Sequence, residues 1–302
     1  MQNRLDSKQQ PCLLCQSDQF ESLGEKNSFR VVRCSKCELV FINPQPSEET
    51  TNALYDESYF AGGSEYGYQG IGYLSNNNEQ WFKYIPTKAI AKIQKIKPQK
   101  GKLLDVGCAV GYALEVAKDK GWEISGVEIS QYARKLAEKK LGISIPETLE
   151  SANYQNDYFD VIAAFEIIEH IHRPQEFIES LHKILKKDGV LCISTPNLDH
   201  AKTFKNFIDW PYLTPPEHLC FFNRQTIQNL LEKNGFEIKE IFFGPINPLA
   251  QGGENIKRIQ KMYHKVRPIV RPIKKLLYDM PMAWYGTKSG LGEDMIIIAQ
   301  KK

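Results

Sequence analysis

The sequence predicts an α/β fold in which a doubly wound, seven-stranded, mostly parallel sheet follows a small cysteine-rich N-terminal segment. Two observations predict this organisation. From residue 99 onward, short apolar runs alternate with amphipathic stretches of roughly 10–15 residues, and this alternation is typical of βαβ units. Two closely spaced cysteine pairs predict the N-terminal segment.

The composition is that of an ordinary globular protein. The 302 residues are 42% hydrophobic and 25% charged, and the net charge is +3. No stretch approaches the roughly 20 apolar residues that a membrane span needs, and residues 1–10 lack the apolar core of a signal peptide. Seven cysteines, four of them in two pairs, suit a reducing compartment better than a disulfide framework. We therefore expect a cytoplasmic protein.

The first domain, residues 1–46, is predicted to be a zinc knuckle. Cys12 and Cys15 form one CxxC pair, and Cys34 and Cys37 form a second. Four thiolates with this spacing are typical of a closed tetrahedral zinc site. Because four protein ligands leave no open position for chemistry, we expect a structural Zn²⁺ ion that stabilises a segment too small for its own core.

Residues 47–98 are predicted to form a lid, a linker and a helix. The first part is rich in Tyr, Gly, Ser and Asn, which indicates loops around a short helix at 48–55. From 79 to 96 apolar residues recur at helical spacing, which predicts an amphipathic helix. The tyrosines that precede this helix either close over a ligand or belong to an ordinary loop: Tyr59, Tyr66, Tyr68 and Tyr73.

The third domain, 99–302, contains the predicted sheet. Strands are expected at 102–107, 123–129, 143–145, 159–166, 189–194, 236–243 and 294–300, and helices at 112–120, 130–140, 174–187 and 224–234. Ser130 is a suitable N-cap, and Gly121 and Gly142 are suitable helix ends. In such sheets ligands bind beyond the carboxyl ends of the strands, so functional residues are expected in the loops there.

A glycine-containing loop follows the first of these strands, with the sequence Leu-Asp-Val-Gly-Cys-Ala-Val-Gly at 104–111. Its spacing is neither GxGxxG nor GxxxxGK[ST], so it does not indicate phosphate binding. Asp105 favours a ligand with a cationic amino group, and Glu128, after the second strand, can accept both hydroxyls of a ribose. A ligand with a ribose, a positive charge and no phosphate is S-adenosylmethionine (SAM).

This order of motifs resembles the class I SAM-dependent methyltransferases, and most closely the group that includes the ubiquinone-biosynthesis O-methyltransferases. Asp105, Gly107 and Gly111 match the family motif D-x-G-x-G-x-G, with Ala109 in place of the middle glycine. The segment 159–171 resembles the family's FD…EHV motif. Residues 100–245 carry the resemblance, which implies a Rossmann-like sheet. Many bacterial members are similar also in beginning with a four-cysteine knuckle.

The resemblance implies a SAM site whose residues follow the first four strands. They are Asp105, Gly107, Cys108, Gly111, Glu128, Ile129, Thr148, Leu149 and Phe165. Thr148 departs from the family pattern, in which an Asp at this place often hydrogen-bonds the adenine.

Methyl transfer to oxygen or nitrogen often needs a base, and histidine is the usual side chain near neutral pH. His170 follows the fourth strand, with Glu169 beside it. His218 lies in the loop after the fifth strand, in a segment similar to the family's PxHxxxF. Because either histidine can instead hold its loop by hydrogen bonds, the sequence leaves open which one is the base.

A basic insertion is expected at 251–288, between the last two strands. Residues 256–275 hold eight Lys or Arg and no Asp or Glu, with apolar residues at near-helical spacing. Three interpretations stay open for 256–277: peripheral contact with an anionic membrane at its inner face, a cap that binds an acidic substrate, or a solvated helix face.

The sequence favours a methyltransferase that acts on a small-molecule or glycan acceptor, with oxygen as the expected target, as in surface polysaccharide or natural-product biosynthesis. The alternative of an RNA methyltransferase is disfavoured by the near-neutral charge outside the insertion. A non-catalytic scaffold is the third hypothesis, and the intact Asp105, Gly107, Gly111 and Glu128 argue against it.

Overall fold

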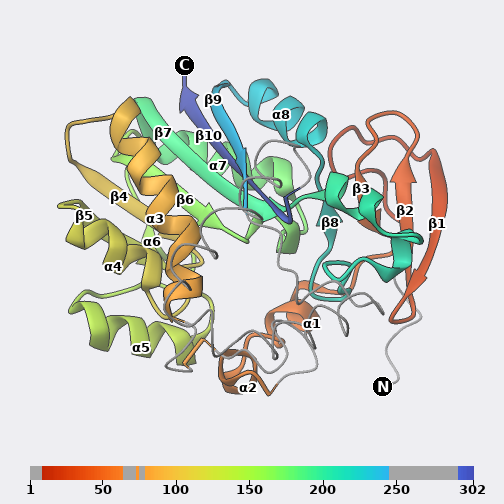
Figure 1. Cartoon of the computed structure of the whole chain (residues 1–302), viewed down its shortest axis with the longest axis horizontal. Coiled ribbons are helices and arrows are strands. Elements are labelled where there is room, and N and C mark those ends of the chain that lie inside the picture. The colour runs from red at the N-terminus through yellow and green to blue at the C-terminus, as the bar shows by residue number, and fades with distance from the viewer. Residues whose placement is uncertain (1–8, 64–72, 75–78, 245–291) are drawn as a thin grey trace, which may run out of the picture.

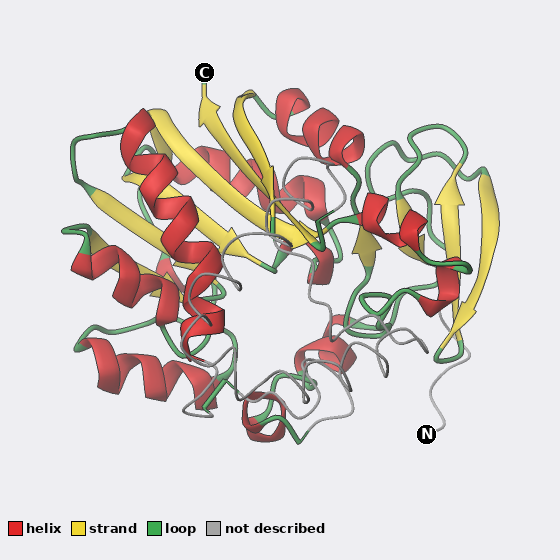
Figure 2. Ribbon diagram, viewed as in Figure 1, coloured by secondary structure: helices red, strands yellow, loops and turns green. Residues whose placement is uncertain are grey.

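The structure is a computed structural model that describes residues 9–63, 73–74, 79–244 and 292–302. A central sheet has helices on both faces, and a smaller sheet lies beside it (Figures 1 and 2). The expected fold class, an α/β protein with a mostly parallel sheet, is confirmed.

The central sheet has the strand order β5-β4-β6-β7-β10-β9. The strands are β4 (Lys102–Val106), β5 (Glu123–Val127), β6 (Phe159–Phe165), β7 (Leu185–Pro196), β9 (Phe236–Phe243) and β10 (Asp294–Lys301). The first four are parallel, and β10 is antiparallel to both of its neighbours. The chain runs from β4 to β5 on one side and then to β6 on the other, which opens a crevice at the carboxyl ends of β4 and β6.

Alternating strand residues face the two helical layers. On one face, Leu104 and Ile162 pack in a cluster with α7 (Pro174–Ile184) and α8 (Arg224–Lys233). On the other, Leu103 and Val161 pack with α3 (Glu79–Ile96) and α4 (Tyr112–Asp119). Figure 2 shows α3 crossing the near face of the sheet. Burial on both sides explains why these strands read as continuous apolar runs.

The helix ends follow the expected signals. The Ser130 hydroxyl accepts a hydrogen bond from the Ala133 amide, which caps the start of α5 (Gln131–Leu141). Gly142 ends the same helix with a φ of 71°. A short helix, α6 (Leu149–Ala152), follows.

The expected strand at 143–145 is wrong, and the central sheet has six strands among the described residues instead of seven. The Ile145 amide donates to the Glu138 carboxylate at 2.9 Å, so it is not available to a strand partner. Pro146 has no amide hydrogen, and its carbonyl accepts one bond, from the Glu128 amide at 3.1 Å. A single backbone bond is not a strand ladder.

The second sheet was not predicted from the sequence. It is antiparallel and contains β1 (Phe20–Lys26), β2 (Phe29–Cys34), β3 (Val40–Ile42) and β8 (Cys220–Phe221). Its last strand comes from the segment after β7, so the cysteine segment is joined to the larger domain by backbone pairing. The domain limits at 46 and 98 stay predictions.

Two small helices, α1 (Glu48–Asn52) and α2 (Glu57–Ala61), lead from the second sheet towards α3. Single 3₁₀ turns lie at η1 (Ile168–His170), η2 (Leu198–Thr203) and η3 (Phe207–Asp209). The basic insertion 251–288, Tyr66 and Tyr68 lie outside the described residues. Among the helices that the structure describes, none is long and apolar enough to cross a membrane.

Substitution of Gly107 tests the tight turn between β4 and α4. Gly107 has a φ of +71°, and a Cβ there would overlap the Ile167 side chain, whereas Gly121 has a φ of +85° and open space around it. Gly121→Ala should lower the free energy of unfolding by about 1–2 kcal/mol from backbone strain alone. Gly107→Ala should cost about 1–3 kcal/mol more, because the side chains must shift. Urea denaturation of the two variants measures this, and equal losses would contradict the described packing.

Candidate active site

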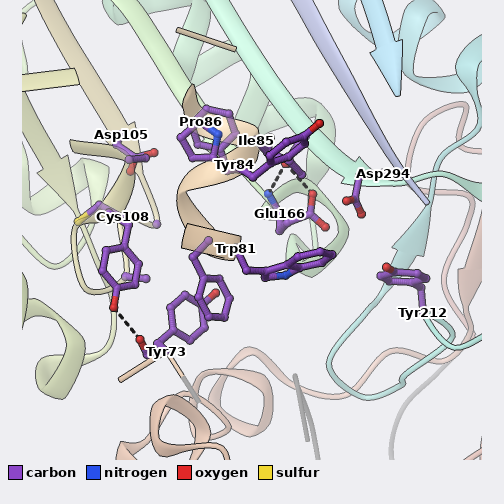
Figure 3. A pocket seen from close by; sticks show the side chains of 17 residues that line it. Tyr73, Trp81, Tyr84, Ile85, Pro86, Asp105, Cys108, Glu166, Tyr212 and Asp294 are labelled. Carbon is purple, nitrogen blue, oxygen red and sulfur yellow. Dashed lines mark hydrogen bonds between the residues drawn. The ribbon is translucent and has the colours of Figure 1, made fainter. Parts of the chain in front are cut away.

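A cavity of about 870 Å³ opens at the carboxyl ends of the parallel strands (Figure 3). One end is formed by Asp105, near the end of β4, and by Gly107 and Cys108 in the loop that follows. The other end is formed by Tyr212 and by Asp294, at the start of β10. The place is the crevice expected of this topology.

Asp105 has the properties expected of a residue that binds a cationic ligand. Its side chain is 2% exposed, and its Oδ1 atom has no hydrogen-bond partner in the described protein. Burial, with a smaller contribution from the neighbouring Glu128, raises the pKa of the carboxyl well above its usual range. A buried oxygen without a partner is costly, and a cationic amino group in the cavity would satisfy it. The residues present therefore fit SAM at this end.

Glu128 ties the glycine-containing loop to the end of β5. Its carboxylate oxygens accept hydrogen bonds from the amides of Ala109 and Ser130, each at 2.8 Å. Burial raises the pKa of the Glu128 carboxyl, while these two amide bonds oppose the shift. Each oxygen keeps a second lone pair for a ligand hydroxyl.

The nine expected SAM residues divide into two groups. Asp105, Gly107, Cys108 and Phe165 line the cavity. Five others do not line it: Gly111 begins α4, Glu128 lies behind the loop, Ile129 is exposed, Thr148 caps α6 and Leu149 packs at the edge of the core. The contact of Thr148 with an adenine stays a prediction.

The two candidate bases lie together. The rings of His170 and His218 are 4.8 Å apart at 71°. The Nδ1 atom of His218 is 2.7 Å from the Tyr212 carbonyl oxygen, and that of His170 is 2.9 Å from the Glu217 carbonyl oxygen. Because a carbonyl oxygen can only accept, the Nδ1 of His218 carries the proton, and its Nε2 keeps its lone pair. The Nδ1 of His170 has a second partner, the Tyr55 hydroxyl. Neither histidine lines the cavity, which they adjoin through Tyr212.

Glu169 lies beneath the histidine pair. It is fully buried, and its Oε1 atom is 4.0 Å from His170 Nε2. Burial raises the pKa of Glu169 to about 8 and lowers the pKa of His170 to about 4. Near neutral pH His170 is therefore uncharged. The ligand atoms of Glu169, His170 and His218 lie within 4.8 Å of one another, so this group could also hold a metal ion.

Several residues that line the cavity were not among the site residues expected from the sequence. Glu166 lines the cavity and accepts a hydrogen bond from the Ser194 hydroxyl at 2.6 Å, and burial raises the pKa of its carboxyl. Its position at the end of a predicted strand was the available signal. Asp294 lines the same cavity because β10 is antiparallel, which places its first residue at the edge where parallel strands end. Trp81 and Tyr212 supply aromatic walls (Figure 3).

The described tyrosines of the expected lid lie around the site. Tyr73 lines the cavity, and its carbonyl oxygen accepts a hydrogen bond from the Tyr112 hydroxyl at 2.7 Å (Figure 3). The Tyr55 hydroxyl is 2.9 Å from His170 Nδ1, and the Tyr59 hydroxyl donates to the Glu217 carboxylate at 2.8 Å. The segment before α3 therefore supports the histidine pair from the side opposite the sheet.

The four paired cysteines come together as predicted. Their sulfur atoms lie within 4.8 Å of one another, with Cys12 and Cys37 3.4 Å apart and Cys15 and Cys34 3.4 Å apart. The contact with Cys37 lowers the pKa of the Cys12 thiol to about 5. A cluster of four sulfurs that includes a readily ionised thiol fits a zinc ion.

Comparison with known proteins gives the family. A family model described as a methyltransferase domain matches residues 73–241. The ubiquinone biosynthesis O-methyltransferase of Pelagibacter ubique is 34% identical over 144 residues, which are 45% of this chain and 58% of that protein. The enzyme of the same name from Actinobacillus pleuropneumoniae serotype 5b is 36% identical over 107 residues, 32% of this chain and 46% of that protein.

The chain thus spans about half the length of the curated relatives that it matches. A solved structure of a SAM-dependent methyltransferase from Archaeoglobus fulgidus covers 74% of this chain and 97% of its own, with 22% identity and a TM-score of 0.49. The resemblance to SAM-dependent methyltransferases of the ubiquinone-biosynthesis type is confirmed. The family model matches more than half of the residues of this chain, so this chain belongs to the methyltransferase domain family.

Proposed function

We propose that this protein transfers the methyl group of SAM to an oxygen atom of a small-molecule acceptor, with a hydroxylated aromatic compound or a glycan as the acceptor class. The observation that carries the proposal is one cavity lined by Asp105 at one end and by Tyr212 at the other, where the Tyr212 carbonyl contacts His218. The names of the matched relatives support oxygen as the target.

When bound, SAM supplies an electrophilic methyl group on a positively charged sulfur. The free oxygen of Asp105 would accept a hydrogen bond from the amino group, and Glu128 would accept the ribose hydroxyls with its remaining lone pairs. The buried carboxyls of Asp105 and Glu166 favour a positively charged ligand in the cavity.

On the acceptor side, Trp81 and Tyr212 offer flat apolar surfaces to an aromatic or sugar ring. His218 is the proposed base. Its Nδ1–H bond to the Tyr212 carbonyl holds the ring, so that Nε2 is free to take the proton of the acceptor hydroxyl. His170, neutral at pH 7 and in ring contact with His218, is the second candidate base.

RNA remains the alternative acceptor, and the cavity disfavours it. Among the residues that the structure describes, no Lys or Arg lines the cavity, whereas Asp105, Glu166 and Asp294 do. Polyanion binding depends on Lys and Arg contacts to phosphate.

We further propose that Cys12, Cys15, Cys34 and Cys37 hold one structural Zn²⁺ ion. Membrane contact through 256–277 stays a prediction.

The ribose role of Glu128 is testable by calorimetry with SAM. Glu128→Ala should weaken binding about 10- to 100-fold, because charge-assisted hydrogen bonds contribute roughly 1.5–3 kcal/mol. Glu237→Ala is the matched control, since Glu237 is exposed on β9 and does not line the cavity. A folded wild-type protein that binds no SAM would contradict the proposed function.

Replacement of His218 tests the proposed base. Methyl transfer from labelled SAM, screened on catechols, sugars and RNA, should fall about 10²- to 10⁴-fold in His218→Asn, while SAM affinity stays unchanged. His182→Asn is the control. His182 lies on α7, packs against Phe236 of β9 and does not line the cavity. Full activity in His218→Asn would exclude His218 as the base, and a preference for RNA would overturn the acceptor class.

Metal analysis tests the zinc site. The purified protein should contain about one zinc ion per chain, and Cys37→Ser should lose it because a closed site needs all four ligands. Cys192→Ala, a change to a buried cysteine on β7 outside the cluster, should keep the ion. Equal zinc content in both variants would refute the assignment.

A further inference from the structure

The loop that carries His218 is hydrogen-bonded to the cysteine segment. In β3, Val40 pairs with Phe221 and Phe41 pairs with Cys220, the two residues of β8. Figure 1 shows the two strands side by side. The pairing extends by one residue, because the Ile42 amide donates to the Leu219 carbonyl at 3.0 Å.

The same loop is bonded on its other side to the η1 turn that carries His170. The Leu219 amide donates to the Glu169 carbonyl at 2.8 Å, so the backbone of Leu219 bridges β3 and η1. Leu219 follows His218 directly, and Glu169 precedes His170 directly. The positions of both histidines therefore depend on a short ladder whose outer strand belongs to the cysteine segment.

Side-chain packing follows the same route. Cys12, Cys34 and Phe41 are fully buried in one cluster with Ile168 and Cys220, which flank the histidine pair in sequence. The strand β3 begins three residues after Cys37 and is only three residues long. A strand of this length needs its flanks fixed to stay paired, and the cysteine cluster is the group that can fix them.

Among the described residues, the strands of the SAM end have no backbone pairing with the cysteine segment, although Val106 and Val127 belong to the same buried cluster. The hydrogen bonds of Glu128 are made with the loop after β4 and the start of α5. Asp105 lies within β4, which pairs with β5 and β6. The two halves of the site are therefore held by different parts of the chain.

We propose that the four-cysteine knuckle is a positioning element for the acceptor half of the site. Metal binding at Cys12, Cys15, Cys34 and Cys37 holds β3, β3 holds the segment 219–221, and this segment sets the orientation of His170 and His218. The SAM half forms without the metal. This inference rests on the proposed function, since it takes the histidine pair as the acceptor side.

The test uses the full-length, uniformly ¹⁵N-labelled protein, before and after zinc is removed with a chelator. Two quantities are measured by NMR: the ring nitrogen shifts of the two histidines, and the exchange rate of the Leu219 amide. A third, the affinity for S-adenosylhomocysteine, is measured by calorimetry. Removal of zinc should speed Leu219 exchange at least tenfold and replace the distinct Nδ1–H signals by averaged ones, with the affinity within twofold of its original value.

A matched pair of variants in the zinc-loaded protein separates positioning from general stability. Val40→Ala removes two methyl groups from β3, and Val190→Ala removes the same two from the middle of β7, where Val190 is equally buried and does not line the cavity. The Leu219 exchange and histidine signals should change in Val40→Ala and stay as in wild type in Val190→Ala.

Unchanged histidine and Leu219 signals after zinc removal would overturn the inference, and so would a parallel loss of ligand affinity, which would show general unfolding. A protein that holds no metal would overturn it as well. Failure of the zinc-loaded wild type to bind S-adenosylhomocysteine would instead contradict the proposed function, because the exchange measurement needs no ligand.

Discussion

The direction of the strands in the central sheet is the constraint on which the site depends. Four parallel strands end at one edge, and antiparallel β10 begins at that edge. Residues far apart in sequence, such as Asp105, Glu166 and Asp294, therefore line one cavity. The change of direction between β4 and β6 keeps the helices apart there and leaves room for a ligand.

Electrostatics distinguish the two ends of this cavity. Asp105 has a buried oxygen without a partner, and its carboxyl gains stability when a cation enters. At the other end Tyr212 lines the cavity, and its carbonyl oxygen accepts a hydrogen bond from His218, which lies behind it and outside the lining. The cavity therefore attracts a cation at one end and adjoins the histidine pair at the other, an arrangement that we propose serves methyl transfer from a sulfonium to a hydroxyl group.

Local sequence signals predicted most of the central fold, and four of the nine expected cofactor residues line the cavity. Ser130, Gly142 and the strand at 236–243 lie where short-range rules place them, because caps and apolar runs are decided within a few residues. The expected strand at 143–145 failed because Glu138 and Pro146 remove its backbone partners. The strand β8 has two residues and no pattern of its own, so its pairing with β3, and the support this gives to His218, could be seen only in three dimensions.

A crystal structure with S-adenosylhomocysteine tests the central claim most directly. The account predicts the ligand between Asp105 and Phe165, with its amino group on Asp105, its ribose on Glu128 and its sulfur directed towards Glu166 and the histidine pair. A ligand bound elsewhere, or a cavity that stays empty at saturating concentration, would contradict it.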